Sequence, residues 1–247
     1  METATAPRHA TAAIIGAGDF IGAAIAKRFA AQGYIVFVGR RNGEKLVPLV
    51  QEIEAAGGRA VARTLDAREE DQVIAFLAEA EAMAPLDVCI FNVGANVNFP
   101  FTETTARVFR KVWEMACYGG FLAGREAAKL MLPRGKGSIF FTGATAGMRG
   151  GAGFAAFASA KFGLRALAQS AARELGPLGL HVAHLVIDAG VDTAWVRARV
   201  SERLGGEIPP GRLMRPEAVA DAYWALHQQP SDAWTFEQEI RPFGEKW

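Results

Sequence analysis

Short apolar runs alternate with longer amphipathic stretches along this chain, and this alternation restricts its fold more than any other feature. Parallel strands buried on both faces are typically continuously apolar, as these runs are. Alternating strands and helices indicate a parallel sheet covered by helices on both sides. The chain therefore predicts a doubly wound α/β fold with three layers, α/β/α. The expected strands are 12–15, 35–38, 60–65, 88–91, 138–142 and 181–187, and the expected helices are 21–31, 44–56, 69–83, 105–131 and 155–175.

No repeat, low-complexity segment or linker divides the 247 residues. We therefore expect one domain over residues 1–247, a common size for an α/β domain. The loosest stretch is 205–211, which contains three glycines and two prolines. It lies late in the chain, and we expect it to belong to a mobile flap rather than to a domain boundary.

The net charge of +1 gives no electrostatic argument for binding nucleic acid or an anionic membrane. No run is long and apolar enough to span a bilayer, and residues 1–11 lack the apolar core of a signal peptide. Two cysteines are too few for a disulfide framework, and no spacing of His, Cys or acidic residues suggests a metal site. These features predict a cytoplasmic protein without a metal.

A glycine-rich turn, GAGDFIG, follows the first expected strand and opens the first expected helix. Gly16, Gly18 and Gly22 allow a tight turn and close approach to a diphosphate, and the helix N-terminus supplies N–H donors. Asp19, Phe20 and Ile21 complete the turn. The alternative is a strand–helix turn without a ligand, but its place after the first strand favours a nucleotide.

The residues after the second strand indicate which dinucleotide would bind. Domains specific for NAD usually place an acid there, whereas this chain has Arg40 and Arg41, which could pair with a 2′-phosphate. Asp19 argues for NAD, because NADP-binding domains often have a basic residue at this place in the glycine-rich turn. This argument fails if Arg40 neutralises Asp19. The two arginines could also be solvated loop residues. The pattern favours NADP over NAD.

With these residues in view, the chain resembles the short-chain dehydrogenase/reductase family, which has a Rossmann-type fold, over essentially its whole length. The resemblance implies that Asp66 and Ala67 contact the adenine side and that Asn92, Val93 and Gly94 shape the cofactor floor. It also implies that Val191 and Thr193 meet the nicotinamide. Phe157 and Lys161 have the spacing of the family's Tyr-x-x-x-Lys motif, and Lys161 would hold the ribose.

The catalytic positions implied by the resemblance depart from the family pattern. Ala116, Ala144 and Phe157 stand where the family has Asn, Ser and Tyr, and only Lys161 is retained. The Tyr normally exchanges a proton with the substrate oxygen, with its pKa lowered by the Lys. Phe157 keeps the ring but has no titratable oxygen.

Phe20 is a second departure, because the family has a glycine there. Halohydrin dehalogenases, a branch of the same fold without the dinucleotide, have an aromatic residue at this place. Phe20 would therefore either crowd the cofactor pocket or point into a gap beside Gly94. A dehalogenase-like activity rests on Phe20 alone and also needs the absent Ser and Tyr.

Two functions follow from these features. The first is an NADP(H)-dependent oxidoreductase with an atypical active site and an unknown substrate. The alternative is a catalytically inactive member of the fold that binds a nucleotide or metabolite, as a sensor or a partner subunit.

The resemblance also implies a homodimer or homotetramer, and the aromatic tail 234–247 suggests a packed segment at a subunit interface. The resemblance further implies that residues 192–215 form a substrate flap. Its arginines, Arg197, Arg199 and Arg203, would form either a solvated helix face or a contact for an anionic substrate.

Overall fold

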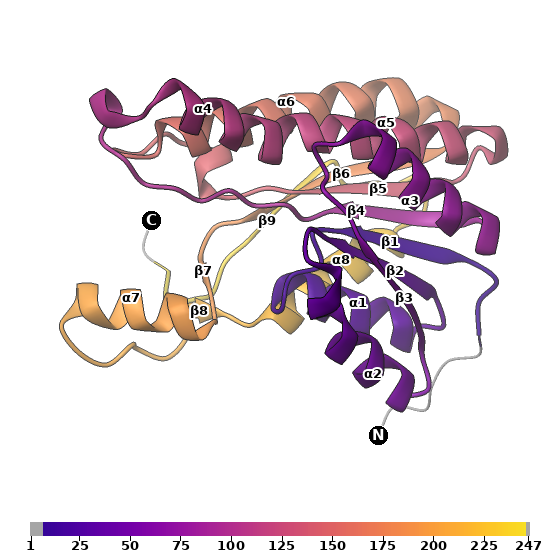
Figure 1. The fold of residues 1–247 in the computed structure, drawn as a ribbon, viewed down its shortest axis with the longest axis horizontal. Coiled ribbons are helices and arrows are strands. Elements are labelled where there is room, and N and C mark those ends of the chain that lie inside the picture. The colour runs from indigo at the N-terminus through magenta and orange to yellow at the C-terminus, as the bar shows by residue number, and fades with distance from the viewer. Residues whose placement is uncertain (1–6, 246–247) are drawn as a thin grey trace.

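A seven-stranded parallel sheet forms the centre of the protein in the computed structural model, which describes residues 7–245 (Figure 1). The strand order is β3-β2-β1-β4-β5-β6-β9, so the chain winds outward from β1 in both directions. This confirms the predicted doubly wound α/β fold. The strands are β1 (Thr11–Ile15), β2 (Ile35–Arg40), β3 (Arg59–Thr64), β4 (Leu86–Phe91), β5 (Gly137–Thr142), β6 (Leu180–Ile187) and β9 (Glu237–Ile240).

Helices cover both faces of the sheet and form two separate cores (Figure 1). Ala12 and Ile14 of β1 point into the core under α1 (Ile21–Ala31), α2 (Val47–Ala55) and α8 (Pro216–His227). Ala13 and Ile15 point to the opposite core, under α3 (Glu70–Met83), α5 (Gly119–Met131) and α6 (Ala155–Leu175). The alternation of side chains along a strand thus builds the three predicted layers.

The predicted helix 105–131 is continuous in the structure but contains one wide turn. Thr105 caps α4 (Ala106–Trp113), where its side chain accepts a hydrogen bond from the Val108 N–H over 3.2 Å. A π-helical turn, Glu114–Tyr118, then joins α4 to α5. Such turns are rare and are frequent at functional sites.

The last strand, β9, was not among the predicted strands. It pairs in parallel with β6 and extends the sheet by one strand at its edge. The segment containing β9 was predicted as a packed tail, and the structure places it on the chain's own sheet. Trp247 of the predicted tail lies outside the described residues.

The predicted flap contains α7 (Ala194–Leu204) and a two-stranded sheet of β7 (Gly190–Val191) and β8 (Leu213–Met214). Figure 1 shows α7 set apart from the main α/β body. The tail contacts the flap, because the Gly244 N–H donates to the Gly211 carbonyl over 3.0 Å and Arg212 pairs with Glu245 at 2.9 Å. None of the helices in residues 7–245 meets the length and hydropathy needed to cross a membrane.

Candidate active site

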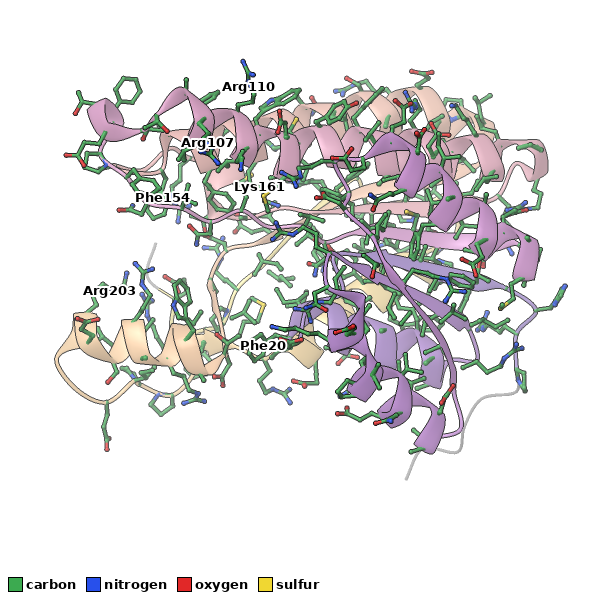
Figure 2. The ribbon with its side chains drawn as sticks, viewed as in Figure 1. Phe20, Arg107, Arg110, Phe154, Lys161 and Arg203 are labelled. Carbon is green, nitrogen blue, oxygen red and sulfur yellow. The ribbon has the colours of Figure 1, made fainter. Side chains whose placement is uncertain are left out.

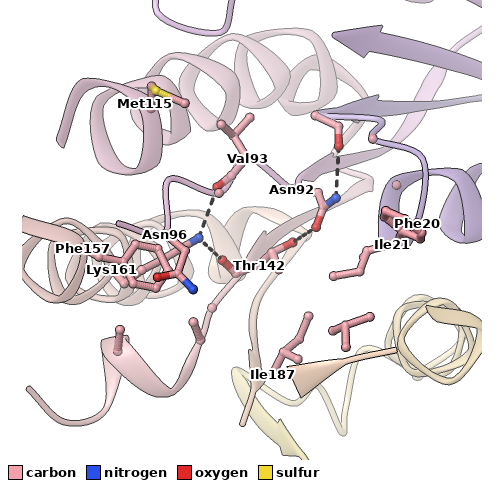
Figure 3. A pocket seen from close by; sticks show the side chains of 18 of the residues that line it. Phe20, Ile21, Asn92, Val93, Asn96, Met115, Thr142, Phe157, Lys161 and Ile187 are labelled. Carbon is pink, nitrogen blue, oxygen red and sulfur yellow. Dashed lines mark hydrogen bonds between the residues drawn. The ribbon is translucent and has the colours of Figure 1, made fainter. Parts of the chain in front are cut away.

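A cleft of about 1170 Å³ lies at the carboxyl ends of the central strands, where ligands bind in open α/β sheets (Figure 3). This volume exceeds the ~300–1,000 Å³ of typical small-molecule pockets. Except for Ala116, all the predicted site residues line it. They are Gly16, Gly18, Asp19, Phe20, Ile21, Gly22, Arg40, Arg41, Asp66, Ala67, Asn92, Val93, Gly94, Ala144, Phe157, Lys161, Val191 and Thr193.

The glycine-rich turn is tightly packed on one side and open on the other. Gly16 has a φ of +90°, and a Cβ atom there would lie 2.8 Å from the backbone of Asn92. A Cβ atom on Gly22 would lie 2.5 Å from the Ala17 Cα. At Gly18 a Cβ atom would meet nothing within 4 Å. The turn therefore has the close packing that requires glycine, and its open side lines the cleft.

Asn92 connects this turn to the middle of the sheet (Figure 3). Its Nδ2 donates to the Gly16 carbonyl over 3.1 Å, and its Oδ1 accepts from the Thr142 hydroxyl over 3.0 Å. The same hydroxyl lies 2.6 Å from the buried Tyr223 hydroxyl. This network holds the cleft floor against the glycine-rich turn.

Positive charge gathers where β2 ends. Arg40 pairs with Asp19, as one sequence alternative required. Arg41 and Lys45 also line the cleft, and neither forms a hydrogen bond or ion pair within residues 7–245. Lys45 was not predicted as a site residue, because it lies in a short 3₁₀ turn where an exposed lysine has no distinguishing pattern.

Asp66 lies across the same end of the cleft and is already paired. Its carboxylate accepts hydrogen bonds from the Arg68 backbone N–H at 3.1 Å and from Arg68 Nε at 2.9 Å. The Arg68 guanidinium holds the pKa of Asp66 below its ordinary range. Asp66 is therefore an ionised carboxylate near neutral pH.

Lys161 is buried at the inner end of the cleft. Its Nζ donates to the Thr142 carbonyl over 2.8 Å and to the Val93 carbonyl over 3.2 Å. Burial lowers the pKa of its ammonium from 10.5 to about 8, and the nearby Cys117 partly offsets this shift. Because a lysine has three N–H donors, one remains for a ligand in the cleft.

Three side chains near Lys161 are apolar, whereas Asn96 is a polar residue beside it that also lines the cleft (Figure 3). Ala116 is fully buried in the π-helical turn, and it belongs to a small core cluster with Phe157; Ala144 packs against this cluster. Met115 lines the cleft in place of Ala116. The nearby Thr145 hydroxyl is engaged, since it donates to Asp188 Oδ1 over 2.5 Å.

Phe20 lies at the rim of the cleft, and the residue is 47% exposed. It also borders a second hollow, lined by α1 and α8 residues. Figure 3 places Phe20 on the side of the pocket opposite Lys161 and Phe157.

Among the described residues, no group of three or more His, Cys, Asp or Glu side chains could hold a metal ion.

The family model for short chain dehydrogenases matches residues 10–203. The chain belongs to the short-chain dehydrogenase family. A crystal structure of a short-chain dehydrogenase from Rhodopseudomonas palustris is 66% identical, with a TM-score of 0.84 over 96% of this chain and 100% of that one.

Two more distant relatives add functional context. A Sinomonas cyclohexanicum protein named cis-4-hydroxycyclohexanecarboxylate dehydrogenase is 33% identical over 91% of this chain and 90% of its own. A metagenomic short-chain oxidoreductase solved in complex with NADP is 26% identical, with a TM-score of 0.81 over 97% of this chain and 99% of that one. The comparisons place the chain among the family's NAD(P)-dependent oxidoreductases.

Proposed function

We propose that this short-chain dehydrogenase is an NADP(H)-dependent oxidoreductase with an atypical proton-transfer site. One observation carries the proposal: a single cleft joins the glycine-rich turn, the unpaired Arg41 and Lys45, and the buried Lys161. The relative solved with NADP supports this cofactor, and the relative named for a hydroxy acid supports an alcohol and its ketone as the reacting pair.

The charges at the end of β2 support NADP over NAD. No acid of the described chain occupies the end of β2 itself, and Asp19 is bound by Arg40. Arg41 and Lys45 are therefore free to pair with a 2′-phosphate, and the planar fork of an arginine suits phosphate oxygens. The open space at Gly18 supports room for the diphosphate.

When bound, a nicotinamide cofactor supplies or accepts the hydride. The chain must then position the ligand and move a proton. With a pKa of about 8, Lys161 can hold or release a proton at Nζ near neutral pH, in the range that suits a general acid. Phe157 and Ala144 exclude water beside it without offering a hydroxyl.

Titration of the purified protein with NADPH and NADH, followed by nicotinamide fluorescence, tests the cofactor. We expect NADPH to bind more tightly, and we expect Arg41→Gln to lose about tenfold in NADPH affinity while NADH affinity changes little, as for loss of one charged hydrogen bond. Arg59→Gln is the matched control, since Arg59 begins β3 beside the amino end of β2, at the opposite end of these strands from Arg41. Equal binding of both nucleotides by the wild type would refute the preference for NADP.

The apolar surroundings of Lys161 favour a second candidate, a catalytically inactive member that binds NADP as a sensor or partner subunit. If the family roles hold, Ala116, Ala144 and Phe157 represent three lost polar groups. Removing a general acid typically costs ~10²–10⁴ in rate. Tight NADPH binding with no change at 340 nm over a panel of ketones and aldehydes would favour this candidate.

We also propose that the protein is a homodimer or homotetramer through its long helices. Trp113, Phe121 and Phe162 are each about 40% exposed, and Tyr118 stacks between Trp113 and Phe121. Such aromatic surfaces are enriched at subunit interfaces. Light scattering of the purified protein would give the oligomeric state.

A further inference from the structure

Helix α7 turns one of its faces toward the cleft, opposite the α/β body. Thr193, Val196 and Arg203 line the cleft, and Val200 is buried between the last two. Their spacing of three, four and three residues places them on the same face. Figure 2 shows Arg203 on α7 and Phe154 on the α/β body across from it.

The side chains of the three flap arginines have different surroundings. Arg197 Nε donates to Asp192 Oδ1 over 2.5 Å, and the Arg199 guanidinium lies 4.7 Å from the centre of the Trp195 ring. Arg203 alone of the three lines the cleft, and it forms no hydrogen bond or ion pair with the residues that the structure describes.

Apart from the Lys161 ammonium at the inner end, the charges in this half of the cleft leave one positive charge without an acidic partner. Arg149 also lines it, but its Nη2 lies 3.3 Å from Asp188 Oδ1, so this guanidinium is largely neutralised. The acidic residues that line the cleft, Asp19 and Asp66, lie at the nucleotide end and are paired with arginines. One uncompensated guanidinium suits a monoanion better than a dianionic phosphate.

The surface between Arg203 and Lys161 is mainly apolar. Met115, Phe154, Phe157 and Val196 line it. A ligand that fills this space would place an apolar body against these side chains and an anionic group at Arg203. Arginine pairs with a carboxylate through two parallel hydrogen bonds.

We propose that the substrate is an apolar carboxylate whose acid group binds Arg203 while its reacting carbon lies near Lys161. This inference rests on the proposed oxidoreductase function and adds its substrate class. It makes Arg203 a specificity residue on the flap, one helical turn beyond Val200 and at the far end of the cleft from the nucleotide.

Binding of simple probes to the NADP⁺-loaded protein tests the proposal without knowledge of the substrate. Cyclohexanecarboxylate is the anionic probe, cyclohexanecarboxamide the neutral one and cyclohexyl phosphate the dianionic one, each followed by ligand-observed NMR. We expect cyclohexanecarboxylate to bind most tightly to the wild type and Arg203→Gln to weaken it roughly tenfold, the loss of a charge-assisted pair. The carboxamide should bind both proteins equally.

Arg199→Gln is the matched control, since it removes the same charge one turn earlier on α7, at a residue that packs on the Trp195 ring and does not line the cleft. It should leave cyclohexanecarboxylate binding unchanged. Equal losses in both variants, or tighter binding of the phosphate than the carboxylate, would overturn the proposal. NADPH titration of the wild type and of each variant separates the substrate class from the proposed function. Unchanged NADPH affinity with no preference for the carboxylate refutes the substrate class alone. A wild type that does not bind NADPH refutes the proposed function.

Discussion

The Lys161 ammonium lies 6.0 Å from the centre of the Phe157 ring, one helical turn away on α6. The ring face therefore stands where it can attract the cation, although at the outer limit of such contacts. The pair shares the inner end of the cleft, and the ring has no oxygen to which the ammonium could donate. Lys161 donates instead to two backbone carbonyls.

The buried Lys161 should make stability depend on pH. Its folded pKa is lowered by burial to about 8, while an unfolded lysine has a pKa of 10.5. Between these values the unfolded chain holds a proton that the folded chain has released, so the free energy of unfolding should rise with pH. The total gain from this group is about 3 kcal/mol, at 1.36 kcal/mol per pKa unit.

Urea unfolding of wild type and Lys161→Met at pH 7.5, 8.5 and 9.5 measures this gain. The stability of the wild type relative to the variant should increase over the series, because all other titrating groups are common to both proteins. A difference that stays constant across the three pH values would show that Lys161 has an ordinary pKa.

Restoring a hydroxyl beside Lys161 should increase activity. We expect Phe157→Tyr, alone or with Ala144→Ser, to raise the rate of NADPH oxidation with a responsive ketone by about 10²-fold, the low end of the effect of a general acid. Phe162→Tyr is the control, because Phe162 directly follows Lys161 on α6 but is 40% exposed and does not line the cleft. An inactive double variant that still folds and binds NADPH would mean that the site lacks more than these hydroxyls.

Asp19 should oppose the binding of a phosphorylated nucleotide. Its carboxylate pairs with Arg40 and adds negative charge to the cleft that Arg41 also lines. Asp19→Asn should therefore tighten NADPH binding about two- to fivefold at low salt, less at high salt, the magnitude of an exposed ion pair. Asp232→Asn, at an exposed site outside the cleft, should have no effect. Weaker NADPH binding by Asp19→Asn would show that Asp19 itself holds the nucleotide.

Local sequence patterns predicted the central sheet and much of the cleft for physical reasons. Buried parallel strands must be apolar on both faces, so their runs were recognisable, and the ends of such strands meet at one edge. The spacing of Phe157 and Lys161 placed both on one helix face. These features depend on neighbours in the sequence.

The parts that the sequence did not predict depend on distant partners. Strand β9 is polar, and its partners are distant in the sequence: it pairs with β6, and its Glu237 accepts from Arg165 Nε over 2.6 Å and lies 3.0 Å from His184 Nδ1. Lys45 is an exposed charged residue, and only the folded chain shows that it lines the cleft. For Arg203 the sequence left a solvated face and a substrate contact open, and the fold places it at the cleft. The π-helical turn has no recognisable sequence signal.

Two glycines in the same turn should separate folding from nucleotide binding. A methyl group on Gly22 would lie 2.5 Å from the Ala17 Cα and 2.7 Å from the Gly16 carbonyl oxygen, both backbone atoms that cannot move aside cheaply. Gly22→Ala should therefore lower the free energy of unfolding by about 1–3 kcal/mol, as overpacking does.

Gly18→Ala is the matched substitution, because its methyl group would meet nothing within 4 Å in the folded chain. Its stability should stay within about 0.5 kcal/mol of the wild type. The methyl group would nevertheless enter the open side of the turn, where we propose that the diphosphate approaches, so NADPH affinity should fall. Urea unfolding and NADPH titration of both variants measure the two effects. Unchanged NADPH affinity in Gly18→Ala would show that the diphosphate does not bind at this turn, because a nucleotide bound there would contact the added carbon.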